Sequence, residues 1–196
     1  MSAIAHLFVI MFFKTYEDGL RRSINRFRWY EYAVSSSLMI VLIAMLWGVW
    51  DIFSLILIAC INASMNLFGD CMELLNAGKP ADEVDWTPYW YGCVAGAYAW
   101  IVVAIYLFAP GQAGDVPTFV WGIVASYIIF FNTFPVTMYR QYRQKGKFNN
   151  ENYPLLKNGG YLLGERRYIT LSFLAKSILL WFVFTGTFQP SSYTAP

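Results

Sequence analysis

Six apolar runs divide the chain, and they constrain its fold more than any other feature. They are residues 1–13, 29–50, 52–75, 86–108, 116–139 and 168–188. Each of the last five has the ~20 residues that an α-helix needs to cross a bilayer. A helix satisfies its backbone hydrogen bonds internally, so these runs predict an integral membrane helical bundle of the all-α class.

Composition narrows the class further. The 196 residues are 58% hydrophobic and 13% charged, which excludes a disordered chain and argues against an ordinary soluble domain. We expect one transmembrane domain over residues 1–196, in contact with the lipid bilayer and with no nucleic acid. Its expected parts are a short span at 1–14, full spans at about 27–50, 52–75, 86–109, 116–142 and 164–188, and a tail at 189–196.

The first apolar run is too short to cross a bilayer. A secretory signal places basic residues before its apolar segment, whereas Lys14 follows this one. We therefore interpret the run as the second half of a helix.

Basic residues fall in alternate loops. Thirteen of the fourteen lysines and arginines lie between the first and second, third and fourth, or fifth and sixth runs. The opposite side carries only Asp51 and Asp115. By the positive-inside rule, the basic loops are cytoplasmic in a multi-pass cell-membrane protein, and the carboxy terminus is extracellular.

The sequence has no residue set typical of a metal site or of an enzyme. Cys60, Cys71 and Cys93 lie in or at the ends of apolar runs without CxxC spacing, and the chain has one histidine. No nucleophile and base stand together as a pair. We predict no metal site and no enzymatic activity.

Lys176 is the only charged residue in the last apolar run. A protonated lysine near mid-bilayer costs several kcal/mol when it is unpaired, which makes Lys176 a candidate functional residue. Asp70 and Glu73 lie at the cytoplasmic end of the third run, and the last three runs contain no carboxylate. Glu31, near the basic end of the second run, is the remaining candidate partner.

Counted along their helices from the basic end, Lys176 and Glu31 do not lie at the same depth. Lys176 lies nine residues past Arg167, about 14 Å along a helix, and Glu31 three past Arg28, about 5 Å. Two plainer interpretations are that Arg28 neutralises Glu31 and that Lys176 is a structural lysine bonded inside the bundle. Ser172, one turn earlier on the same face, is placed to hydrogen-bond its nitrogen. A desolvated lysine amine also reacts readily with aldehydes.

Aromatic and small residues give two weaker signals. Tryptophans near the ends of the runs, such as Trp29, Trp47 and Trp86, predict interfacial belts. Gly92 and Gly96 have GxxxG spacing, which allows close approach of another helix, either within the bundle or in a homodimer.

Five segments resemble the heliorhodopsin family. They are RWYEY (28–32) with SSSLMIVLI (35–43), VDWTP (84–88), and GERRYI (164–169) leading into LSFLAKSILLW (171–181). The resemblance extends in order from about residue 2 to residue 190. It implies a rhodopsin-like seven-helix fold with a cytoplasmic amino terminus, which agrees with the charge distribution. Because it begins inside the family's second helix, we expect six spans in this sequence, without the first helix; the chain is then either a fragment or shortened gene model, or a six-span relative.

The resemblance implies a retinal-binding photoreceptor. All-trans retinal would be attached to Lys176 as a protonated Schiff base, with Glu31 as counterion and Ser172 alongside. The other implied pocket residues are Ser36, Met39 and Ile40 along the polyene, Asn62 and Met65 near the ring, Phe130, Phe131 and Phe134 as aromatic walls, and His6 in a polar cavity. For His6, the alternative is a packed residue that makes one hydrogen bond.

The leading function is a light sensor that signals to an unidentified cytoplasmic or membrane partner without pumping ions. A pump needs proton donors and acceptors toward both surfaces, which the last three runs do not supply. One alternative is a light-gated or light-driven ion pathway, lined by Ser35, Ser36, Asn62, Asn66 and Asn132. Another is a retinal-free membrane interaction protein.

Overall fold

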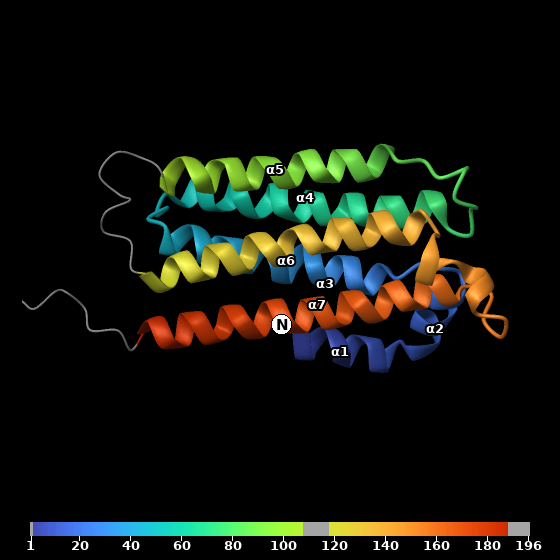
Figure 1. Ribbon diagram of the computed structural model, residues 1–196. Helices are drawn as coiled ribbons and strands as arrows, with labels where there is room; N and C mark the ends of the chain where they lie inside the picture. Colours follow the sequence, from blue (N-terminus) through green and yellow to red (C-terminus); the bar gives the residue numbers. More distant parts are fainter. Residues whose placement is uncertain (1, 108–117, 188–196) are drawn as a thin grey trace, which may run out of the picture.

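The computed structural model describes residues 2–107 and 118–187, and all regular secondary structure in these ranges is helical (Figure 1). Asp115 and the tail at 189–196 lie outside them. The α-helices are α1 (Ser2–Met11), α2 (Phe13–Arg21), α3 (Arg26–Leu46), α4 (Ile52–Asn76), α5 (Thr87–Leu107), α6 (Thr118–Tyr142) and α7 (Gly159–Thr187), with the short 3₁₀ helices η1 (Gly146–Phe148) and η2 (Asn150–Asn152) between α6 and α7.

Five of the described helices, α3 to α7, are long and apolar enough to cross a membrane. This confirms the expected all-α membrane bundle. The first apolar run does not form one long helix, because α1 ends at Met11 and α2 begins at Phe13. Phe12 between them departs from helical backbone angles, with φ −112° and ψ 37°.

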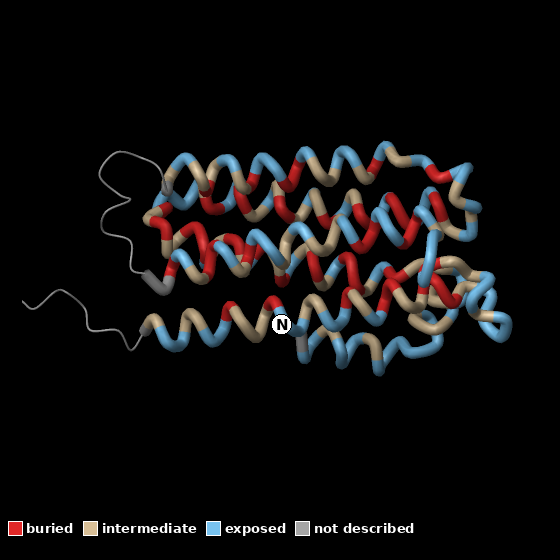
Figure 2. Tube along the Cα trace, viewed as in Figure 1, coloured by how far each residue is buried: buried red, intermediate tan, exposed pale blue. Residues whose placement is uncertain are grey.

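The long helices lie side by side (Figure 1). α3 packs against α4, α4 against α5, and α6 against α7, while α1 contacts α3. Figure 2 shows buried residues alternating with exposed ones along the helices. Many outward side chains are large and apolar, such as Phe53, Leu57, Phe173 and Leu180, and they suit contact with lipid.

Two apolar cores fill the bundle. One lies toward the turn between α3 and α4 and includes Ile40, Ile43 and Val103, together with residues of α6 and α7. The other lies nearer the basic loops and is largely aromatic, with Trp29, Tyr142 and Tyr168 at its centre. Trp29 packs directly over Gly69 of α4, where a Cβ atom would overlap the indole ring.

Local sequence signals set the helix ends. The Asn25 side chain accepts a hydrogen bond from Arg28 N at the start of α3, and Asp51 accepts one from Ser54 N at the start of α4. Gly48 adopts φ 85° in the short reversal between these helices, a conformation that favours glycine. This short reversal leaves α3 and α4 antiparallel and adjacent (Figure 1).

Candidate functional site

Lys176 of α7 and Glu31 of α3 meet across the bundle. Lys176 Nζ lies 2.5 Å from Glu31 Oε1, and the two side chains are 25% and 14% exposed. Lys176 Nζ also lies 5.6 Å from the centre of the Tyr32 ring, within cation–π range. The structure therefore brings together Lys176 and the carboxylate that the sequence left as its candidate partner.

A cavity of about 540 Å³ lies between α3, α4, α5, α6 and α7, with Lys176 in its lining. This volume falls within the range of small-molecule sites. Eight of the residues expected in the pocket line it: Lys176, Ser172, Ser36, Met39, Met65, Phe130, Phe131 and Phe134.

The other four expected residues are not part of this lining. Glu31 contacts Lys176 instead of the cavity itself. Asn62 lies behind Ser36, and its Nδ2 donates to Ser36 Oγ at 2.7 Å. Ile40 is fully buried in the apolar core, and His6 is exposed on α1.

Serine and asparagine side chains form one polar wall. Ser36 Oγ accepts hydrogen bonds from Asn62 Nδ2 and, at 3.0 Å, from Asn66 Nδ2, and it donates to Tyr32 O at 2.7 Å. These contacts tie α3 to α4. The lining around this wall is mostly apolar and aromatic, so a ligand here meets few polar atoms.

The cavity also includes residues that the sequence did not assign to it. Trp29 was interpreted as an interfacial residue, but this was wrong: it is 5% exposed and lines the cavity. Trp100 and Tyr127 also line it, and their rings lie 5.9 Å apart. Within an apolar helix, the sequence does not show whether an aromatic side chain points toward lipid or inward.

The GxxxG glycines face α4 of the same chain. A Cβ atom on Gly92 would lie 3.4 Å from Phe68 Cβ, and one on Gly96 would lie 2.8 Å from Met65 Sδ. A Cβ atom on Gly96 would also lie 3.3 Å from the Phe131 ring. The motif thus serves close packing within the bundle, and both glycines help to line the cavity.

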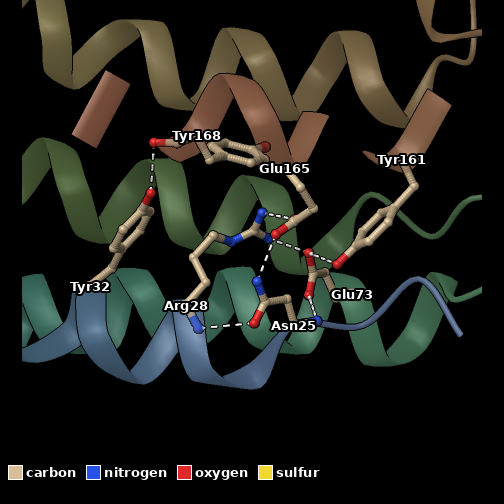
Figure 3. Close-up of polar contacts among 7 residues, drawn as sticks. All are labelled: Asn25, Arg28, Tyr32, Glu73, Tyr161, Glu165 and Tyr168. Atoms are coloured by element: carbon tan, nitrogen blue, oxygen red, sulfur yellow. Dashed lines mark hydrogen bonds and ion pairs between the residues drawn. The ribbon is translucent and has the colours of Figure 1, made fainter. Parts of the chain in front are cut away.

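A second charge cluster is buried nearer the basic loops (Figure 3). The Arg28 guanidinium bonds to Glu73 of α4 and Glu165 of α7, and all three side chains are at most 5% exposed. Asn25 N donates to Glu73 Oε2 at 2.8 Å, and Asn25 Nδ2 donates to Glu165 Oε2 at 2.7 Å. The Tyr161 hydroxyl lies 3.3 Å from Glu73 Oε1.

The sequence did not show this cluster, because its carboxylates were considered only as partners for Lys176. The expected span at 164–188 contains Glu165, and α7, which begins at Gly159, buries this side chain. Glu73 is likewise buried one turn before the end of α4. Arg28, the alternative partner considered for Glu31, bonds these two carboxylates.

Comparison with known proteins gives one family. The model of the family described as Heliorhodopsin matches residues 1–188, which include α1 to α7 and every residue of the cavity lining. A search of curated proteins found no match.

Replacing Arg28 by Met tests the charge cluster. The change leaves Glu73 and Glu165 buried without their cation, so we expect a loss of about 3–5 kcal/mol in the free energy of unfolding. Denaturant unfolding of the purified protein in detergent measures it. The matched control is Arg21→Met, because Arg21 pairs with Glu17 on the exposed surface of α2, where water screens the charges. Equal losses in the two variants would contradict the assignment.

Proposed function

The chain belongs to the heliorhodopsin family, and from this premise we propose that it is a light sensor in which Lys176 holds retinal covalently and Glu31 balances the charge. Members of the family are retinal-binding, light-sensing membrane proteins. The observation that carries the assignment to these residues is the Lys176–Glu31 pair beside a largely apolar cavity.

The described residues suit an apolar molecule with one reactive polar end. Lys176 is the only lysine in the cavity lining, and its Nζ is the amine that would condense with an aldehyde. Aromatic side chains supply most of the remaining wall, among them Trp100, Phe131 and Phe134. All-trans retinal bound there would supply visible absorption and a light-driven change of shape.

The protein's own groups would keep the attachment nitrogen charged in the dark. Glu31 lies within hydrogen-bonding distance of Lys176 Nζ and stabilises a positive charge on it. The Tyr32 ring presents its negative face to the same atom. The lining around this end of the cavity is largely aromatic, and its low polarity strengthens both interactions.

Ionisable groups are distributed unevenly about this pair. Toward the basic loops lie the Arg28 cluster and the Arg26–Asp70 pair. Toward the opposite end, the described parts of α3 to α7 and the turn between α3 and α4 contain one carboxylate, Asp51, which is exposed. Hydrogen bonds from Ser54 lower the pKa of the Asp51 carboxyl. Among the described residues, the carboxylates supply no outer half of a proton relay, which supports sensing over pumping.

Exposed basic residues mark the end of the bundle where a partner would read the signal. Arg143, Lys145 and Lys147 follow α6, and Lys157 precedes α7, all of them exposed. By the positive-inside rule we place this end in the cytoplasm and the end of α7 outside. A cytoplasmic partner with an acidic surface would complement this charge.

Lys176→Ala tests the attachment site. Purified protein mixed with all-trans retinal should develop a visible absorption band, and the variant should lose it because no amine remains in the cavity lining. Lys157→Ala is the control, since Lys157 is exposed in the loop before α7, and it should keep the band. A band of equal strength in Lys176→Ala would exclude Lys176 as the attachment residue.

Glu31→Gln tests the counterion. Removing the negative charge destabilises a cation on Lys176 Nζ, so the absorption maximum should move to the red or the pKa of the attached nitrogen should fall. A spectrophotometric pH titration measures both quantities. Glu151→Gln, which changes an exposed loop carboxylate, should have no effect on either. If Glu31→Gln also changes neither, Glu31 is not the counterion.

Vesicles loaded with retinal-bound protein test the absence of transport. Illumination should produce no sustained pH change or ionic current, because the described carboxylates do not form a route to both surfaces. A light-driven proton pump in parallel vesicles serves as the positive control. Sustained flux that Lys176→Ala abolishes would favour the ion-pathway alternative.

A further inference from the structure

Polar residues at the start of α3 and along α7 form two facing stripes, of which Figure 3 shows the part nearest the basic loops. On each helix they are spaced three and four positions apart, which places them on one face. The stripes are Asn25, Arg28 and Tyr32 on α3, and Glu165, Tyr168, Ser172 and Lys176 on α7.

Contacts run without a break from Lys176 to the Arg28 cluster. Lys176 Nζ lies 5.6 Å from the centre of the Tyr32 ring. The Tyr32 hydroxyl donates to the main-chain oxygen of Tyr168 at 2.9 Å. The Tyr168 ring centre in turn lies 4.2 Å from Arg28 Cζ. Tyr32 therefore joins the amine of the proposed retinal site to a buried charge cluster on the basic side.

The cluster joins three helices through one cation. Arg28 belongs to α3, Glu73 to α4 and Glu165 to α7. The main chain of α7 packs closely against α6, whereas α7 meets α3 through side chains, which include Glu165 on Arg28 and the ring of Tyr168 on that of Trp29. A small displacement of α7 would therefore separate buried charges, which favours two distinct arrangements over a continuous range.

We infer that Tyr32 is a positioning residue that couples the charge on Lys176 to a lock formed by Arg28, Glu73 and Glu165. Loss of the positive charge at Lys176 Nζ removes the cation from the Tyr32 face and leaves Glu31 without this partner. Tyr32 then turns, its hydroxyl leaves the Tyr168 carbonyl, and the basic end of α7 separates from α3 and α4. The light trigger rests on the proposed function. The tether, by which we mean the Tyr32 contacts with Lys176 and with the Tyr168 carbonyl, acts in the protein without retinal as well.

The first experiment measures the lock without retinal. Spin labels are attached at the exposed Cys71 of α4 and at Ile169→Cys on the exposed face of α7, with Cys60 and Cys93 replaced by Ala. Pulsed electron paramagnetic resonance gives the distance between the labels. Lys176→Met and Tyr32→Phe should each lengthen it by ~2 Å or more, the scale of helix shifts in switching proteins.

Two controls separate the tether from general loosening. Lys176→Arg keeps a cation and should keep the original distance. Tyr153→Phe removes another tyrosine hydroxyl that bonds a main-chain oxygen, that of Lys147, outside the stripes, and it should also have no effect. Unchanged distances in both Lys176→Met and Tyr32→Phe would overturn the inference.

The second experiment repeats the measurement with retinal, in the dark and under illumination. The distance should lengthen in the light, and Tyr32→Phe should lose at least half of this change while the absorbance change at the chromophore persists. A pigment whose absorbance changes while the label distance stays fixed would overturn the coupling and leave the proposed function intact. Failure to form any pigment would instead contradict the proposed function, and the retinal-free distances would still decide the tether.

Discussion

The pairing of Lys176 with Glu31 is the interaction on which the proposed site depends. A charged amine inside an apolar bundle needs an anion nearby, and only another helix can supply it at this depth. The pair therefore ties α7 to α3, two helices whose main chains make few close approaches. It also places the amine at the edge of an apolar cavity, beside a carboxylate that balances its charge.

The two buried charge centres on α3 differ in what they can do. Lys176 and Glu31 are partly exposed and Lys176 lines the cavity, so a ligand or a change of charge reaches this pair through Lys176. Arg28, by contrast, is enclosed by two carboxylates, and any separation there leaves charges unpaired in a medium of low dielectric. The Lys176–Glu31 pair is therefore suited to respond to a ligand or to a change of charge. The Arg28 cluster is suited to hold α3, α4 and α7 together.

Small residues that leave space form the cavity together with the large aromatic residues that line it. Gly92 and Gly96 bring α5 close to α4 while leaving room beside Met65 and Phe131. The aromatic walls then give the space its apolar character. The polar atoms of Ser36 are turned toward α4 and the main chain, where they already have hydrogen-bond partners.

The lengths of the apolar runs and the position of each charge are local properties of the chain. They determined the five long helices, their alternating direction and the choice of Glu31 as partner for Lys176. Only the tertiary structure decided where α7 begins, that Glu165 is buried beside Arg28, that Trp29 points inward, and that the pair closes an apparent gap of ~9 Å in depth. The physical reason is that helices apolar on every side carry little record of which face meets a neighbour. A lysine side chain also leans toward the start of its own helix, and how far it reaches depends on how two helices are placed in space.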